Sequence, residues 1–140
     1  MSQTAIVLPV FAQVLLTFVV LIVMAMRRRN AFATDGVKMK DIALGQSAWP
    51  DEATKAANNF RNQFETPVLF YVACIIALVT KSVDYAMVAM AWVYVASRVG
   101  HALIHLGSNI VMQRFYLYLV GLVALLIMWI LLFVRVGLGA

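Results

Sequence analysis

The chain has 140 residues, of which 64% are hydrophobic and only 12% are charged, and its net charge is +5. This apolar share exceeds that of ordinary soluble domains, so a single integral membrane domain spanning residues 1–140 is expected. The basic residues are concentrated between residues 27 and 55, and a cytoplasmic loop explains that cluster more simply than nucleic-acid binding. We therefore expect no nucleic-acid partner.

The first predicted element is a membrane helix over about residues 4–29. Residues 5–26 form a largely apolar segment that meets the roughly 20 residues a helix needs to cross the hydrocarbon core of a bilayer. Three arginines, residues 27–29, follow it where a cleaved signal peptide would have small residues, so the helix is expected to be retained. Residues 30–49 are expected to form a loop.

The second and third helices are predicted over about residues 52–80 and 84–108, and each has a short apolar run. Residues 67–80 would form only about 21 Å of helix, against a hydrocarbon core of roughly 30 Å. The third apolar run is similarly interrupted by Arg98. Both helices must therefore extend into their polar flanks to cross, and Pro67 is expected to kink the second helix just beyond Glu65.

The fourth helix is predicted over about residues 113–136, because residues 115–134 are apolar and lie between two arginines. Short polar links at residues 81–84 and 107–113 favour an antiparallel arrangement. The predicted fold class is therefore all-α, an integral membrane four-helix bundle. The positive-inside rule places the 27–55 loop in the cytoplasm and both termini outside.

Polar residues recur at helical spacing on the second and third helices. The second helix carries Asn58, Asn62 and Glu65 with Arg61 beside them, and the third carries Tyr94, Arg98, His101 and His105. Ionisable groups inside a membrane span usually turn inward and often mark a site. Three arginines, residues 61, 98 and 114, outnumber the single carboxylate of Glu65, so a bound anion is expected. The alternative is structural: an Arg61–Glu65 helix pair and an Arg98 that snorkels to the headgroups.

Two further features favour packing over chemistry. His101 and His105 have the i, i+4 spacing that can bind zinc, but the chain has no third histidine and the nearby arginines repel a cation. We therefore predict no metal site. The single cysteine, Cys74, lies in an apolar run and is expected to be a buried packing residue.

Two motifs resemble the signatures of the MAPEG family, the membrane-associated proteins of eicosanoid and glutathione metabolism. They are RNQFET at residues 61–66 and RVGH at residues 98–101. The chain length, the four-helix layout, the AFA sequence at residues 31–33 and the position of Arg114 match as well. The resemblance covers nearly the whole chain and implies a homotrimer that binds glutathione at subunit interfaces open to the cytoplasm. We interpret the chain as a bacterial-type member of the inner membrane.

The resemblance also implies roles for particular residues. Arg114 matches the arginine thought to stabilise the glutathione thiolate, and is the candidate catalytic residue. Asn58 and His105 depart from the family, which usually has an arginine and a tyrosine there. The candidate ligand-binding residues are Arg28, Arg29, Asn58, Arg61, Asn62, Glu65, Tyr94, Arg98, His101 and His105.

Three functions remain open at this point. The first is a membrane glutathione transferase or peroxidase, with glutathione as a substrate and hydrophobic small molecules or lipid hydroperoxides as acceptors. The second is a non-catalytic binder of an anionic lipid headgroup or metabolite in the same pocket. The third is an assembly module in which the buried charges only fix the helix register. The expected partners are other copies of the chain, membrane lipids and hydrophobic small molecules.

Overall fold

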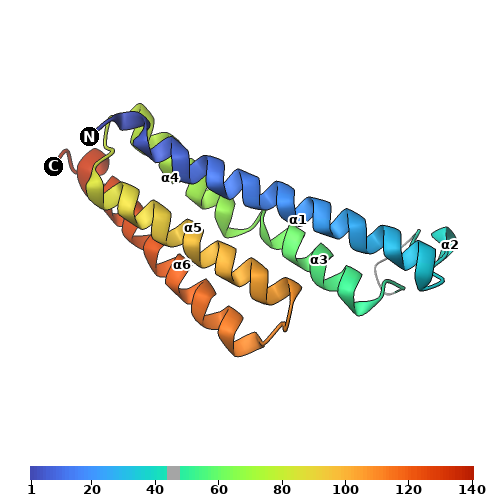
Figure 1. Cartoon of the computed structure of the whole chain (residues 1–140). Coiled ribbons are helices and arrows are strands. Elements are labelled where there is room, and N and C mark those ends of the chain that lie inside the picture. Colours follow the sequence, from blue (N-terminus) through green and yellow to red (C-terminus); the bar gives the residue numbers. More distant parts are fainter. Residues whose placement is uncertain (44–47) are drawn as a thin grey trace.

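The structure, a computed structural model, describes residues 1–43 and 48–140, and its regular elements there are all helical. Four antiparallel rods form an elongated bundle with both termini at the same end (Figure 1). In this described part of the chain, four helices are long and apolar enough to cross a membrane. They comprise Gln3–Thr34, Asp51–Val79, Tyr85–Leu106 and Val111–Gly137. The predicted all-α bundle with four spans is therefore confirmed.

The first rod is longer than predicted. A short 3-10 helix, η1 (Gln3–Ile6), leads into α1 (Val7–Thr34), which runs five residues beyond the predicted end at residue 29. The sequence after the arginines contains no helix breaker until Gly36, whose φ of +70° is the left-handed conformation that ends helices. A four-residue helix, α2 (Met39–Ile42), lies in the predicted loop, of which residues 44–47 are outside the described part of the chain.

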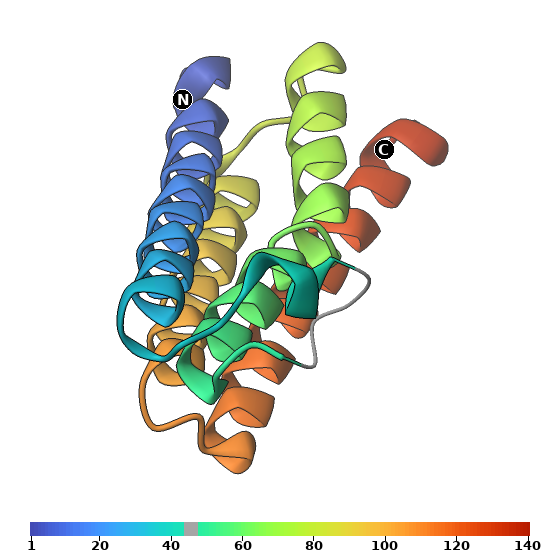
Figure 2. The same ribbon diagram turned by 90° about the vertical axis from the view of Figure 1, so that its right-hand side faces the viewer.

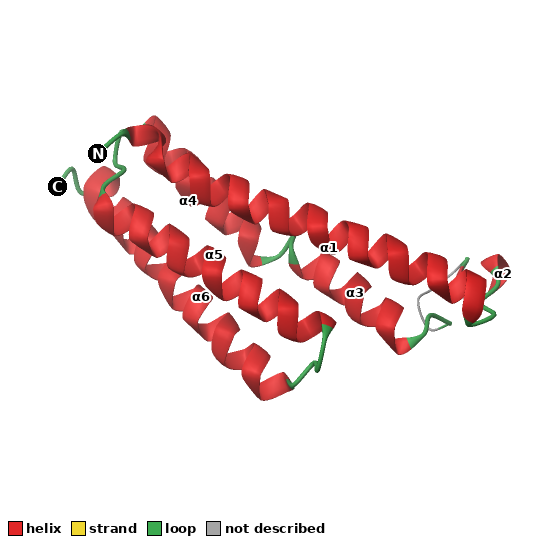
Figure 3. Ribbon diagram, in the orientation of Figure 1, coloured by secondary structure: helices red, strands yellow, loops and turns green. Residues whose placement is uncertain are grey.

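The second rod is interrupted and not merely kinked. It consists of α3 (Asp51–Asn62) and α4 (Thr66–Val79), which a short non-helical connection separates in Figures 2 and 3. The predicted kink lay beyond Glu65, whereas the helix is lost at residues 63–65, before that point. Pro67 explains the interruption, because it has no N–H to donate and its ring disfavours a continuous helix through the preceding turn.

The third and fourth rods make the most extensive helix–helix contact among the described residues. They are α5 (Tyr85–Leu106) and α6 (Val111–Leu132), the latter continuing into a π-helix, η2 (Phe133–Gly137). Gly121 permits this contact, because a Cβ at that position would overlap the hydroxyl of Ser97. The buried rings of Phe70 and Tyr94 stack with centroids 4.6 Å apart and join α4 to α5.

Polar contacts tie the rods together at both ends of the bundle. At the end where α5 finishes, Arg27 of α1 donates to the backbone carbonyls of Glu52 at 3.1 Å and Leu106 at 2.8 Å. At the end that holds the termini, Asp84 caps α5 by accepting from the Met87 amide and pairs with an arginine of η2. These contacts hold the helices together at both ends of the bundle, and the polar residues of the predicted site lie between them.

Candidate functional site

Arg98 is the most deeply buried charge of the candidate site, with only 1% of its surface exposed. One guanidinium nitrogen, Nη2, donates to the side-chain oxygen of Asn62 at 3.2 Å and to its backbone carbonyl at 3.5 Å. Asn62 is the last residue of α3, so Arg98 meets the negative end of a helix dipole, which the interruption places inside the bundle. The two other guanidinium nitrogens are buried and have no hydrogen-bond partner within residues 1–43 and 48–140.

A hollow opens beside this pair, at the meeting point of α3, α5 and α6. Its volume is about 270 Å³, and we call it the central hollow. Arg114 contributes a cation to its wall, and the Nε of that side chain is buried without a hydrogen-bond partner among the described residues. Within the described chain, neither Arg98 nor Arg114 makes an ion pair with a carboxylate. The central hollow is lined by Asn62, His101, Val111, Arg114, Phe115 and Tyr118.

A second hollow of about 230 Å³ lies one helical turn farther toward the end of α5, and we call it the outer hollow. Asn58 and His105 both line it, each four residues from its counterpart in the central hollow. The His101 and His105 rings, 5.7 Å apart, mark the boundary between the two. The structure therefore brings together two of the predicted ligand-binding residues here, but in a separate compartment from Arg114.

Tyr94 continues the polar line in the opposite direction, toward the middle of the bundle. Its buried hydroxyl shares a hydrogen bond of 3.0 Å with the hydroxyl of Thr66, the first residue of α4. The second rod and α5 thus meet at three levels. Asn58 and His105 line the outer hollow, Asn62 bonds to Arg98, and Thr66 bonds to Tyr94. The predicted polar face of α5 therefore contacts the second rod at several turns, and His101 on that face also packs beside Tyr118 of α6.

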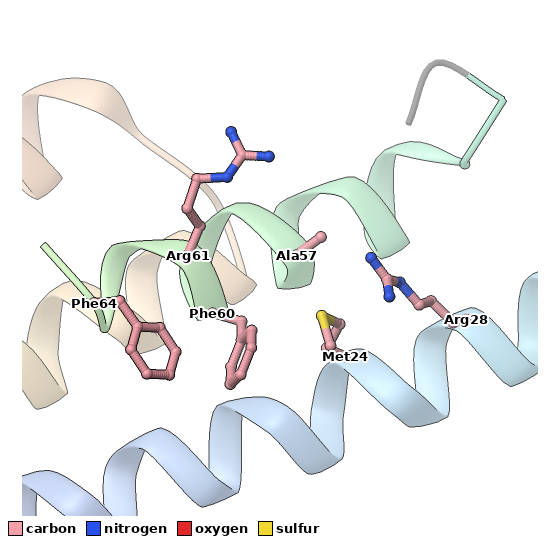
Figure 4. Close-up of a pocket in the computed structure, with 6 residues that line it drawn as sticks. All are labelled: Met24, Arg28, Ala57, Phe60, Arg61 and Phe64. Atoms are coloured by element: carbon pink, nitrogen blue, oxygen red, sulfur yellow. The ribbon is translucent and has the colours of Figure 1, made fainter. Parts of the chain in front are cut away.

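Arg61 and Arg28 lie elsewhere, which corrects the prediction that Arg61 belongs to the same cluster as Asn62. Both line a hollow of about 350 Å³ between α1 and α3, shown in Figure 4. Phe60 points toward α1 in that view, whereas the guanidinium of Arg61 points away from it. Arg28 lies over the ring of Trp49, with its guanidinium carbon 5.1 Å from the ring centroid.

Two more predicted residues are exposed. Arg29 lies on the outer surface of α1, and Glu65 lies on the surface at the interruption of the second rod. The Arg61–Glu65 helix pair, considered as a structural alternative, is not among the ion pairs of the described residues. Its geometry is lost because the helix ends at Asn62, so residues 61 and 65 no longer lie on successive turns.

Tyr118 and Thr66 lie in the site although they were not among the predicted site residues. Tyr118 follows Arg114 by four residues, a spacing that would have placed it on the same face of α6. Three amides that are almost completely buried beside Asn62 were also not among the predicted site residues: Gln13, Asn59 and Gln63. In residues 1–43 and 48–140, no group of three histidine, cysteine or acidic side chains could hold a metal ion.

The fold and the two hollows together define a class, a multi-pass α-helical membrane protein with a buried arginine next to an interrupted helix. The family model described as MAPEG family matches residues 6–134, and the chain belongs to this family. This confirms the family predicted from the RNQFET and RVGH motifs. No curated protein and no solved structure matches the chain.

Proposed function

We propose that this MAPEG protein binds an anionic thiol, glutathione or a close analogue, in the central hollow and transfers it to, or uses it to reduce, a hydrophobic electrophile. The observation that carries the proposal is the charge balance of the hollow. Arg98 is buried and Arg114 lies on the wall, and within the described chain no carboxylate pairs with either. A guanidinium without a carboxylate partner interacts favourably with a nearby anion, so a bound anion stabilises this arrangement.

Three residues of the wall and the buried Arg98 have roles in this proposal. Arg114 is the candidate catalytic residue, because a guanidinium beside the sulfur favours the thiolate, which is the nucleophile. Arg98 supplies a fixed positive potential from behind Asn62, and the Asn62 amide and His101 imidazole offer hydrogen bonds to the peptide groups of the ligand. The exposed apolar faces of the helices would let the second substrate arrive from the lipid.

Two reactions are compatible with this arrangement. In conjugation, the thiolate forms a carbon–sulfur bond while the electrophile releases a leaving group or opens a ring. In peroxide reduction, the thiolate attacks the terminal peroxide oxygen, the oxygen–oxygen bond breaks, and the departing alkoxide takes a proton. A second glutathione then converts the sulfenic acid to a disulfide with release of water. Glutathione is the reductant, so no further cofactor is needed.

The proposal also includes the setting of the protein. A homotrimer of the bacterial inner membrane, with the hollows facing the cytoplasm and both termini outside, is consistent with the basic residues at 27–29 near the end of α1. Membrane lipids and other copies of the chain are the proposed partners. Chemical cross-linking in native membranes tests the trimer, and labelling of single introduced cysteines at either end tests the orientation.

The direct test of function is thiolate absorbance. Glutathione is added to the purified protein in nanodiscs, and the ultraviolet difference spectrum is recorded for the wild type, Arg114→Ala and, as a control, Arg135→Ala. The control removes an arginine from the opposite end of the same rod. We expect a thiolate signal in the wild type and the control, and loss of that signal in Arg114→Ala. No signal in any of the three proteins contradicts the proposal.

The second candidate function, a non-catalytic binder of an anionic lipid headgroup or metabolite, is favoured by one observation. The outer hollow has Asn58 and His105 where characterised family members usually have an arginine and a tyrosine, and the Lys55 ammonium there is already bonded to Glu52 at 2.9 Å. Fewer donors are thus free to hold a second carboxylate. This function predicts that an anionic lipid co-purifies, that it is displaced by salt, and that no thiolate signal appears.

A further inference from the structure

Three side-chain amides form a buried hydrogen-bonded chain across the bundle, which we call the amide ladder. Gln13 of α1 donates to Gln63 at 3.0 Å, Gln63 donates to the side-chain oxygen of Asn59 at 3.1 Å, and Asn59 donates to the backbone carbonyl of Ala102 at 3.1 Å. Between 0% and 1% of each amide residue is exposed. The ladder therefore joins α1, the end of α3 and α5 through groups that meet neither lipid nor water.

The ladder acts at the point where the second rod loses its helical bonds. Gln63 is the residue that follows the last turn of α3, and its amide also donates to the backbone carbonyl of Asn59 at 3.3 Å. That carbonyl belongs to the last turn of α3, where carbonyls lack partners within the helix. An unpaired backbone group costs several kcal/mol in a bilayer, so Gln63 holds the interrupted end in a defined position.

The same end carries the contact on which the candidate site depends. Asn62 precedes Gln63 in the chain, and its backbone and side-chain oxygens both accept from Arg98. At its far end the ladder attaches to Ala102, which follows His101 of the central hollow. A shift in the last turn of α3 would therefore move Asn62 away from Arg98 and change the spacing of the hollow wall.

We propose that Gln13, Gln63 and Asn59 are positioning residues, whose ladder holds the interrupted end of α3 so that Asn62 remains bonded to the buried Arg98 and the central hollow keeps its shape. The ladder residues are absent from the lining of the hollow, so they act through Asn62 and not by touching a ligand. The part of this inference that concerns binding rests on the proposed function; the part that concerns the position of α3 does not.

The test compares Gln63→Met and Gln13→Met with a matched control, Gln3→Met, in the full-length protein in nanodiscs. The side chain of Gln3 also makes two hydrogen bonds to a distant part of the chain, but at the opposite end of the bundle. It donates to the backbone carbonyl of Val83 at 3.2 Å and accepts from the backbone amide of Val83 at 3.1 Å. Three quantities are measured for each variant: the thermal unfolding temperature, hydrogen exchange of the backbone amides at residues 63–65, and the dissociation constant of glutathione.

We expect Gln63→Met to speed exchange at residues 63–65 and weaken glutathione binding, each by about tenfold, in the range found for residues coupled to a site through packing. Gln13→Met removes one bond and should give a smaller change in the same direction. Gln3→Met should lower the unfolding temperature without changing either quantity. Gln13 lies in α1, and Gln13→Met leaves the bond between Gln63 and Asn59 intact. Gln13→Met therefore supplies the test if Gln63→Met does not fold.

The other outcomes show whether the positioning role or the proposed function has failed. If the ladder variants unfold at lower temperature but exchange and bind like the control, the ladder is only structural and the inference is overturned. If glutathione does not bind the wild type, the proposed function fails, while faster exchange at residues 63–65 in the ladder variants still supports the positioning role. Unchanged exchange in Gln63→Met overturns that role whether or not glutathione binds.

Discussion

Replacing Arg98 by methionine tests whether this residue is needed for ligand binding or for folding. Burying one guanidinium costs several kcal/mol after relaxation. The end of the α3 dipole recovers up to about 2 kcal/mol, and the hydrogen bonds to Asn62 contribute about 1.5–3 kcal/mol each. Because these terms nearly cancel, and methionine fills similar space, we expect the free energy of unfolding of the unliganded protein to change by only about 1 kcal/mol.

The effect on anion binding should be larger. An anion in the central hollow at about 7 Å from the Arg98 charge interacts with it by about 2.4 kcal/mol at an effective dielectric constant of about 20. Losing that interaction weakens binding by about fiftyfold, since each 1.4 kcal/mol is a factor of about ten. Arg98→Lys keeps the charge but not the planar fork, so its affinity should lie between those of the wild type and Arg98→Met.

The assay is thermal unfolding in nanodiscs with and without glutathione, together with the oligomeric state by mass photometry. The expected result is a nearly unchanged unfolding temperature without ligand and loss of the increase that glutathione produces in the wild type. If Arg98→Met is strongly destabilised but the glutathione-induced increase persists, Arg98 is structural and the charge argument for the hollow is wrong. Arg98→Met that leaves both assembly and affinity unchanged would support the assembly-module hypothesis instead.

Three further predictions concern residues around the site and the bundle. Gly121→Ala should cost about 1–3 kcal/mol of unfolding free energy, because the new methyl group overlaps the Ser97 hydroxyl, and adding Ser97→Ala should recover part of it; additive effects in a double-mutant cycle would contradict this contact. Asp84→Ala should cost about 1–2 kcal/mol through the lost helix cap and the lost pairing with Arg135, and a variant as stable as the wild type in denaturant titration would exclude that role. Tyr118→Phe keeps the shape of the hollow wall but removes a hydroxyl; calorimetry should show glutathione binding weakened by about three- to tenfold, and unchanged affinity would remove Tyr118 from the site.

The sequence by itself determined the number of membrane helices and which face of α5 is buried. Apolar runs of bilayer length predicted the first and fourth rods, and the shortness of the two middle runs required polar residues inside the bundle. Arg98 and His101 are indeed buried, since an ionisable group at membrane depth has no stable position facing lipid. The RNQFET and RVGH motifs were sufficient for the family.

Only the tertiary structure decided which polar residues meet. Periodicity treated the second rod as one helix and grouped Arg61 and Glu65 with Asn62. Arg61 instead lines the hollow between α1 and α3, because consecutive residues of a helix point in different directions. The interruption at residues 63–65 leaves Glu65 on the surface, outside the central hollow. The amide ladder was equally hidden, because Gln13 lies 50 residues from Gln63 and appears in the sequence only as an isolated polar residue in an apolar helix. Spacing along a chain fixes the direction of a side chain relative to its own helix axis. The partner it reaches depends on how the helices rotate and cross, which is set by packing among all of them.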